Sequence, residues 1–303
     1  MDALSHTLII VILFLTAGGT PSLLPFAIIG AVIVDADIVF RIVSDRSPQL
    51  YMFTHGGFAH SIVGSVVLSG LATIGILLAY LAGIIPALAL TIPLALSFFV
   101  ILAGALIHLG IDVLAYPGIP LGYPLSDRKI TVGIFPGPSI LLFITTGSSF
   151  VSWVFGRVTT PFALGFATVS IFLYLGFRIV AFLGIRARHP RGRRVPLPNP
   201  LQWIIIDEDE ISFLVTRCSL IGRISTQERF EKYINTDSSE TERFLALPDI
   251  RRLKFHSYIT SAEKTRSEFI FSDPLREKGY FRYPPDFLRS VIPIIHGPDL
   301  IRG

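Results

Sequence analysis

Apolar residues run in long blocks through the first 185 positions and in short alternating stretches after them. Breaks that contain Gly or Pro separate the blocks, and each block is long enough for a helix. The pattern predicts a mostly α fold: a polytopic transmembrane bundle of about six helices, followed by a small cytoplasmic α+β or mostly-β domain. The predicted helices are Met1–Ala17, Leu23–Phe40, Ser61–Gly83, Ala87–Leu114, Ser139–Gly156 and Pro161–Ile185.

The first two blocks are short for membrane spans. Between Thr7 and Val34 there are 28 uncharged residues, whereas two full spans need about 40. No basic residue precedes the first block, so we expect a retained helix and not a cleaved signal peptide. The sequence leaves open whether these two helices cross the bilayer or re-enter it.

Charged residues divide the chain near the same place. Residues 1–185 carry 12 charged side chains with no net charge, and residues 186–303 carry 36 with a net charge of +4. We therefore expect a transmembrane domain (1–185), an Arg/Pro-rich linker (186–200) and a soluble cytoplasmic domain (201–303). This division excludes a secreted soluble protein, a disordered chain and a single water-soluble domain.

A cluster of arginines directly after the last block sets the predicted orientation. Positive charge beside a span marks its cytoplasmic side, so six helices place both termini in the cytoplasm. We expect a multi-pass protein of the cell (inner) membrane, with the lipid bilayer as its partner. The positive charge has this local origin, so no nucleic-acid partner is expected, and the oligomeric state is open. The cluster consists of Arg186, Arg188, Arg191, Arg193 and Arg194.

The polar half predicts a small domain of short elements. Gln202–Ile206 and Ile211–Ser219 alternate like two strands around an acidic turn. Further strands are predicted at Leu253–Ile259 and Glu268–Ser272, and a short capped helix at Ser239–Leu247. Docking, regulation and partial cover of a site are all open roles for this domain. Three histidines without spaced partners are predicted to be structural or surface residues: His189, His256 and His296.

Seven ionisable residues stand at helix ends in the charge-poor half. The predicted orientation puts all of them at the cytoplasmic ends of four successive helices. Asp at membrane depth costs about 2.5–3.5 kcal/mol on insertion scales, so such groups mark functional sites. Imidazole and carboxylate together are ligands for Zn²⁺, Mn²⁺ or Fe²⁺. The candidate metal ligands are His6, Asp35, Asp37, His55, His60, His108 and Asp112.

The spacing within this set supports shared ligation. His108 and Asp112 are four residues apart, so they lie on one helical face and can bind one ion together. His55 and His60 are five apart with two glycines between them, which suits a loop that enters a helix. Seven ligands are enough for one or two divalent ions that each keep a water. Zinc is the favoured metal, with manganese and iron as alternatives.

These residues fall in segments that resemble the YdjM-type family of membrane-bound metal-dependent hydrolases. The family pattern reads, in order, an early His, Pro-Asp-x-Asp, His-Arg-Gly-x-Thr-His-Ser and His-x-x-x-Asp. The resemblance covers roughly residues 1–140, and a more distant similarity extends to the zinc-dependent phospholipase C and nuclease superfamily. The matching segments are Ser5-His6, Asp35-Ala36-Asp37, His55–Ser61 and His108–Asp112.

The chain departs from the family pattern beside the ligand candidates. Val34 stands at the family's Pro, Gly56 at its Arg and Ala59 at its Thr, and Ala115 at a common Thr. The candidate ligands themselves are all retained. The departures therefore affect the groups that support the ligands, which bear on the number of ions and the catalytic rate.

The resemblance implies metal-dependent hydrolysis of a phosphoester or lipid-linked substrate at the cytoplasmic membrane face. A bound ion would lower the pKa of a water toward about 7 and polarise a phosphoryl or carbonyl oxygen. Asp35 and Asp37 are the catalytic candidates, because either could bridge two ions or orient the water. Arg128 and Lys129 could bind an anionic headgroup, although charges that set the topology are the plainer interpretation of this pair.

Two other functions fit the same residues. In an ion or proton-coupled transporter, the His and Asp side chains would bind the carried ion or relay protons. Transporters usually place such groups near the midplane within internal repeats. Here the groups gather at one face and no repeat is visible, which favours hydrolysis. In a membrane-anchored interaction protein, the soluble domain would act alone and the polar set could be lost without consequence.

Overall fold

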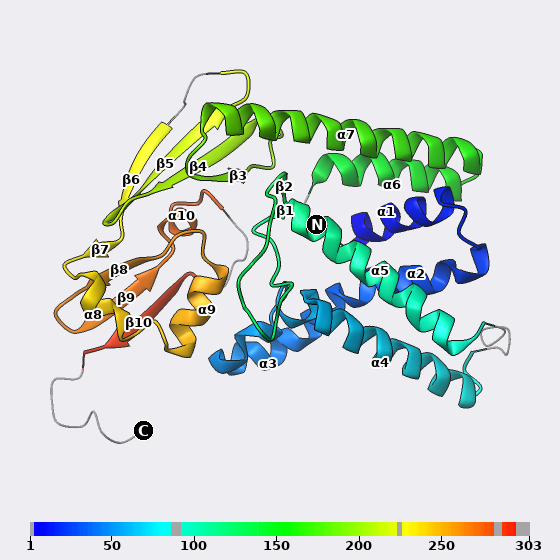
Figure 1. Ribbon diagram of the computed structural model, residues 1–303, viewed down its shortest axis with the longest axis horizontal. Helices are drawn as coiled ribbons and strands as arrows, with labels where there is room; N and C mark the ends of the chain where they lie inside the picture. Colours follow the sequence, from blue (N-terminus) through cyan, green and yellow to red (C-terminus); the bar gives the residue numbers. More distant parts are fainter. Residues whose placement is uncertain (1–2, 86–91, 138, 223–225, 282–286, 295–303) are drawn as a thin grey trace.

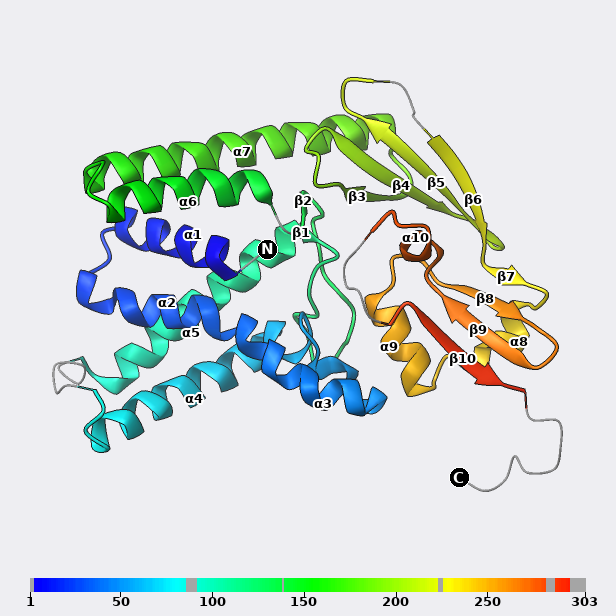
Figure 2. The ribbon, with the colours of Figure 1, turned by 180° about the vertical axis from the view of Figure 1, so that it is seen from behind.

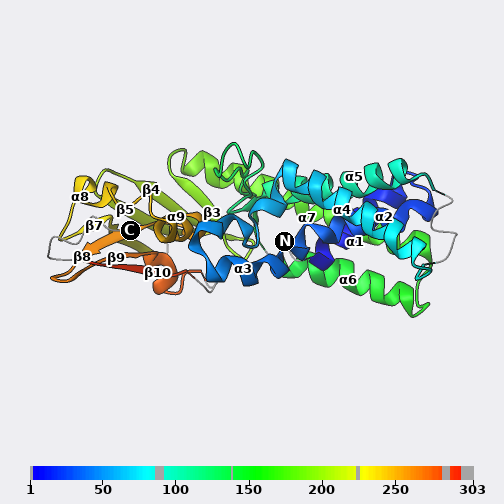
Figure 3. The same ribbon diagram turned by 90° about the horizontal axis from the view of Figure 1, so that it is seen from below.

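The computed structural model places a helical part and a sheet-rich part end to end (Figure 1). Viewed from below, the helices lie along the long axis of the molecule and the sheets lie at one end of them (Figure 3). The structure describes residues 3–85, 92–137, 139–222, 226–281 and 287–294. His296 and the first residues of the predicted Ala87–Leu114 helix lie outside these ranges.

Every predicted apolar block contains a helix. Among the described residues, four helical segments are long and apolar enough to cross a membrane: Pro21–Arg46, Ile62–Leu81, Leu94–Leu114 and Thr160–Arg188. The other two apolar helices are shorter, so the predicted count of six spans is supported for four of them. The helices are α1 (Ala3–Thr16), α2 (Leu24–Ile33), α4 (Ile62–Leu81), α5 (Leu94–Leu114), α6 (Ile140–Val154) and α7 (Thr160–Arg188).

The helices have apolar outer faces. Large side chains such as Leu71 on α4 and Phe172 on α7 are 58% and 62% exposed. A water-soluble protein seldom exposes a continuous surface of this kind, whereas lipid tails solvate it well. The outer faces are therefore consistent with contact with membrane lipid.

Helices α2 and α5 cross at two glycines, which lets their backbones touch. A Cβ at Gly30 would overlap the carbonyl oxygen of Ile101, and one at Gly104 would overlap that of Ala27. Small residues permit such close approach between apolar helices. The residues after α2 are thereby held against the last turns of α5. A 3₁₀ turn, η2 (Asp35–Phe40), and the short helix α3 (Arg41–Arg46) continue the chain beyond α2.

Two four-stranded sheets make up the C-terminal part (Figure 2). The first is antiparallel in chain order, and the second has the order β10-β9-β8-β7 with only the β7–β8 pair parallel. The predicted pair of strands around the acidic turn is confirmed as β4 and β5. The strands are β3 (Arg193–Pro196), β4 (Gln202–Glu208), β5 (Ser212–Ser219), β6 (Thr226–Glu231), β7 (Tyr233–Ile234), β8 (Ser261–Lys264), β9 (Glu268–Ser272) and β10 (Arg289–Pro293).

One strand prediction was wrong. The segment Leu253–Ile259 contributes to helix α9 (Pro248–His256) instead of forming a strand. Pro248 begins the helix, where its missing N–H costs nothing. Ile250 and Leu253 are three residues apart and both buried, which is helical spacing. Two short helices complete this part, α8 (Ser238–Glu242) and α10 (Pro274–Glu277). The predicted capped helix at Ser239–Leu247 thus begins one residue earlier and ends at Glu242.

Strand β4 is buried on both faces. Trp203 and Ile205 pack with Ala181 and Ile185 of α7, whereas Ile204 on the opposite face joins the core of the sheet domain. A strand covered on both sides is continuously apolar and does not alternate. The last turns of the longest apolar helix therefore serve as one layer of the C-terminal fold.

The stretch 186–200, predicted as a linker, is structured. Helix α7 runs on to Arg188, and strand β3 uses four residues of the stretch. The Arg178 side chain is fully buried, and it donates hydrogen bonds to the carbonyl oxygens of Ile134 (Nε, 3.0 Å) and Pro200 (Nη1, 2.9 Å). One guanidinium thus ties α7 to the loop before α6 and to the start of β4.

Helix α9 packs on the 3₁₀ segment η3 (Pro48–Phe53) of the helical part. The Tyr51 hydroxyl donates to Asp127 Oδ2 at 2.7 Å, and Arg251 Nη2 of α9 lies 3.3 Å from the same oxygen. The rings of Tyr116 and Tyr258 stack across the same boundary, 5.6 Å apart. The two parts are thus joined by specific contacts as well as by the chain.

The α2–α5 crossing predicts that Gly30→Ala destabilises the protein. The added methyl group meets a backbone carbonyl that cannot move aside, and overpacking of this kind costs about 1–3 kcal/mol. Thermal unfolding of the protein in detergent measures the effect. Gly75→Ala in α4 is the control, because a Cβ there meets open space. An equal midpoint for the two variants would contradict the close crossing.

The buried guanidinium predicts that Arg178→Met loosens the C-terminal part. The substitution leaves the carbonyls of Ile134 and Pro200 without their donor, at about 1–3 kcal/mol for each buried unpaired group. We expect faster proteolytic cleavage between residues 186 and 202 in limited digests. Arg157→Met changes an exposed arginine at the far end of α7 and should digest like the wild type.

Candidate metal centre

The seven predicted ligand residues come together at the ends of the helices that face the C-terminal part. They come from four places in the chain: α1, the turn η2 after α2, the loop and 3₁₀ turn η4 (Phe58–His60) before α4, and the last two turns of α5. Most of these side chains are buried, and His55 is the most exposed at 37%. Helix ends that are far apart in sequence therefore form one polar cluster.

Asp112 lies at the centre of the cluster. Its Oδ1 is 3.3 Å from His6 Nε2, and its Oδ2 is 3.2 Å from His108 Nε2 and 3.4 Å from His60 Nε2. The rings of His6 and His108 pack edge to face with centroids 3.8 Å apart. Three imidazoles from three different elements thus present Nε2 to one carboxylate.

Asp35 supplies a second carboxylate close to the same imidazole nitrogens. Its Oδ1 lies 3.4 Å from His60 Nε2 and 3.6 Å from His108 Nε2. Both oxygens of Asp35 are buried without a hydrogen-bond partner, and so is Nε2 of His6. Buried polar atoms without partners are costly. They are the expected consequence of ligands arranged around a cation.

The separations within the cluster fit metal ligation. Four ligand atoms each about 2.0–2.1 Å from a tetrahedral zinc ion lie about 3.3 Å from one another. The Nε2-to-carboxylate distances around Asp112 and Asp35 run from 3.2 to 3.6 Å. Two sets of three ligand atoms can each hold an ion, His6 with His108 and Asp112, and Asp35 with His55 and His60.

Asp37 lies behind the imidazoles and not between them. Its two oxygens are 2.9 Å from His55 Nδ1 and 3.0 Å from His60 Nδ1, and the Gly56 N–H donates to Oδ2 at 3.2 Å. His108 is held similarly, since its Nδ1 donates to the carbonyl of Ala31 at 2.7 Å. A carboxylate or carbonyl on Nδ1 orients a histidine so that Nε2 faces a metal.

The backbone at Gly56 explains one departure from the family pattern. Its φ is +77°, in the left-handed region that favours glycine. The family's arginine would be strained in this conformation. In this conformation the Gly56 amide donates a hydrogen bond to Asp37 Oδ2 at 3.2 Å.

The carboxylates make the centre favourable for positive charge. Burial lowers the pKa of His60, but Asp35 and Asp37 outweigh this and raise the pKa to about 10. A protonated imidazole would balance the negative charge of these carboxylates, and so would a divalent cation. The geometry and the charge of the site therefore point the same way.

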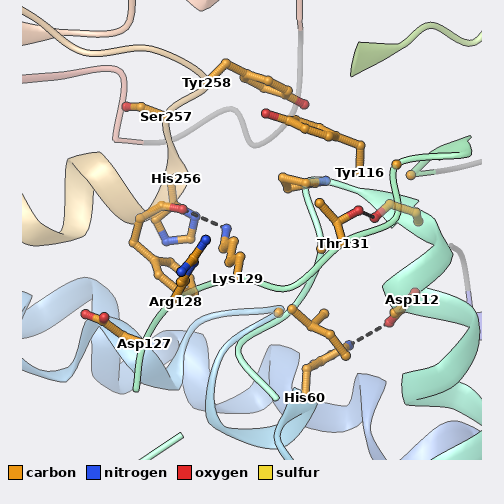
Figure 4. A pocket seen from close by; sticks show the side chains of 18 of the residues that line it. His60, Asp112, Tyr116, Asp127, Arg128, Lys129, Thr131, His256, Ser257 and Tyr258 are labelled. Carbon is orange, nitrogen blue, oxygen red and sulfur yellow. Dashed lines mark hydrogen bonds and ion pairs between the residues drawn. The ribbon is translucent and has the colours of Figure 1, made fainter. Parts of the chain in front are cut away.

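A chamber of about 1060 Å³ opens beside the cluster (Figure 4). His60 and Asp112 lie at one end of it, and the loop with Arg128 and Lys129 forms part of its wall. Lys129 Nζ donates to the carbonyl of Phe255 at 2.7 Å. The two predicted headgroup-binding residues thus face the same space as the candidate ligands.

His256 is a chamber residue that the sequence did not indicate. It was predicted to be structural or surface, yet it lines the chamber, and its Nε2 lies 3.2 Å from Thr54 Oγ1, beside His55. The two partners are 202 residues apart in the chain. No local spacing could reveal this contact, because it depends on how α9 packs on the helical part.

Comparison with known proteins places the helical part in one family. The family model described as YdjM inner membrane protein matches residues 1–185, which is more than half of the chain. No curated protein and no solved structure gives a significant match. The matched region contains all seven clustered candidate ligands and ends where α7 enters the sheet domain. The chain therefore belongs to the YdjM inner membrane protein family.

Proposed function

We propose that this protein is a membrane-embedded metal-dependent hydrolase that acts on a phosphoester or lipid-linked substrate at the cytoplasmic membrane face. The observation that carries the proposal is the carboxylate of Asp35, whose two buried oxygens have no hydrogen-bond partner while Oδ1 lies at ligand spacing from Nε2 of His60 and of His108. The chamber beside them supports a hydrolase, because a substrate has space to reach the ions.

Some of these residues would bind the metal, and others would hold the metal-binding side chains in position. His6, His108 and Asp112 would hold one divalent ion. Of the second set, Asp35 and His60 would hold another ion or share the first, which leaves His55 available for proton transfer. Zinc is the favoured metal for this donor set, with manganese or iron as alternatives. When bound, the metal lowers the pKa of a coordinated water and polarises a phosphoryl oxygen of the substrate.

His55 and Asp37 would handle the proton. His55 is the candidate ligand most open to the chamber, and its Nδ1 lies 2.9 Å from Asp37 Oδ1. This contact holds the ring and leaves Nε2 to accept a proton from water or to return one to the leaving group. Asp37 thus acts through the two histidines that it contacts, as a positioning residue.

The metal content of the purified protein tests the ligand set. In maltoside detergent, we expect at least one divalent ion per chain by mass spectrometry. His108→Ala and Asp112→Ala should each reduce metal affinity by at least tenfold, because each removes a donor. His189→Ala serves as the control, since His189 lies outside the cluster. Wild-type protein without stoichiometric metal would refute the proposal.

The metal-loaded protein is then assayed on phosphomonoesters, phosphodiesters and phospholipids. We expect hydrolysis that a chelator abolishes and added zinc or manganese restores. A protein that binds metal but hydrolyses none of these substrates, and moves the ion across vesicle membranes, would instead be a transporter.

The position of Asp37 predicts a selective catalytic defect in Asp37→Asn. At saturating metal we expect kcat to fall about 10- to 100-fold while KM stays within about twofold, because the variant no longer orients His55 and His60. Asp37→Glu keeps the charge and should recover part of kcat. Unchanged kcat in Asp37→Asn would show that the residue has no positioning role.

A further inference from the structure

The chamber beside the metal centre has two walls of different origin. One wall is the loop after α5, with Lys129 and Asp127. The other belongs to the C-terminal part and includes Arg193 of β3 and Lys254 of α9. The family match ends at residue 185. The second wall therefore belongs to the portion of the chain that the family model does not describe.

Cations dominate the lining of this chamber. Among the described residues, six Lys and Arg side chains line it, against the two carboxylates Asp112 and Asp127. Asp112 belongs to the candidate metal centre, and Asp127 is paired with Arg251. The described part of the lining therefore carries a surplus of positive charge. The six cations are Arg128, Lys129, Arg193, Arg194, Arg251 and Lys254.

Lys129 of the loop after α5 and Lys254 of α9 are two lining cations that remain available for a ligand, as is Arg128 beside Lys129. Within the described part of the chain, neither ammonium lies within 4.0 Å of a carboxylate. Arg251, by contrast, pairs with Asp127, and Arg194 Nη1 bonds to the carbonyl of His189 at 2.9 Å. A lysine that lines a cavity without a carboxylate partner is suited to bind an anion.

The surroundings of Lys129 are unfavourable for its charge. Nζ lies 3.9 Å from the centre of the Phe255 ring and donates a hydrogen bond to the neutral backbone carbonyl of the same residue. Burial lowers the pKa of Lys129 to about 7. An ammonium has three donors, so two protons remain for a ligand. An anion in the chamber would restore the charge that burial disfavours.

We infer that the C-terminal domain forms one wall of the substrate site, where Lys129 and Lys254 bind the phosphate group of the substrate. The inference rests on the proposed hydrolase and names its substrate class, a phosphate ester. The volume of about 1060 Å³ exceeds that of a phosphate group alone, so part of the esterified molecule would enter with it. The two lysines come from the loop after α5 and from helix α9, so the ligand would contact both parts of the protein.

Binding of inorganic phosphate tests this inference. The metal-loaded protein in maltoside detergent is titrated by calorimetry, as wild type, Lys129→Met and Lys254→Met. We expect each substitution to raise the Kd about tenfold, since each removes a charged hydrogen-bond donor. Metal content should stay unchanged, because neither lysine is a ligand. Lys278→Met is the control, since Lys278 is paired with Glu228 at 2.9 Å outside the chamber.

Two further measurements make the result decisive. Lys129→Arg keeps the charge at the half-buried position and should retain most of the phosphate affinity, which separates loss of charge from loss of folding. Lys254 is exposed on α9, so its substitution leaves the fold intact. Phosphate binding that is equal in the wild type and both methionine variants, with metal bound, would overturn the inference while leaving the hydrolase proposal in place.

The source of the phosphate is distinguished by comparing glycerol 3-phosphate with phosphatidic acid in the same detergent micelles. At least tenfold tighter binding of phosphatidic acid identifies a lipid headgroup, and equal binding identifies a soluble phosphate ester. Both results support the lysine site if they respond to Lys129→Met and Lys254→Met. The two proposals can fail separately. If the protein never holds metal but its phosphate binding depends on the two lysines, the lysine site is supported and the hydrolase proposal is not. A chelator-treated sample gives this measurement without metal.

Discussion

The candidate metal centre depends on the close crossing of α2 and α5. Gly30 and Gly104 remove the side chains that would keep the two backbones apart. Ala31 can then offer its carbonyl to His108 Nδ1, and Asp35, four residues further on, comes within reach of His108 Nε2. The two apolar helices are held together by close packing alone, because lipid provides no hydrophobic force between them.

Burial and charge act together once the helices are in place. Asp35 and Asp112 are held among imidazoles at the end of an apolar bundle, where an uncompensated carboxylate is expensive. The contacts of Asp37 keep the rings of His55 and His60 turned in one direction. The side chains that favour a bound cation are thus also those whose burial would destabilise the protein most if no cation were present.

The C-terminal part gives this centre a second wall. Arg178 and the packing of Trp203 on α7 attach the first sheet to the helical part, and α9 meets η3 beside the Lys129 loop. The chamber between the parts combines a centre rich in carboxylates with a lining rich in cations. The proposed phosphate-ester substrate would match both, because its oxygens could approach a bound metal while lysine and arginine balance its charge.

Much of this protein could be predicted from its sequence. The apolar blocks showed the helices, and the scarcity of charge in residues 1–185 singled out the seven ligand candidates. The α9 segment was misread as a strand, because short apolar stretches fit either period and the burial of Ile250 and Leu253 is a tertiary fact. The stretch 186–200 was predicted to be a linker, because its Pro and Arg residues do not indicate that a neighbouring strand will pair with it.

The sequence by itself determined which residue types stand at the helix ends. An Asp or His in an apolar block is easily recognised, because burying an ionisable side chain there is energetically costly. Only the tertiary structure decided that Asp35 lies near Nε2 of His60 and His108 while Asp37 contacts Nδ1 of His60. It also brought His256 next to Thr54, across 202 residues. Such contacts depend on helix crossing and domain packing, and neither leaves a periodic mark in the chain.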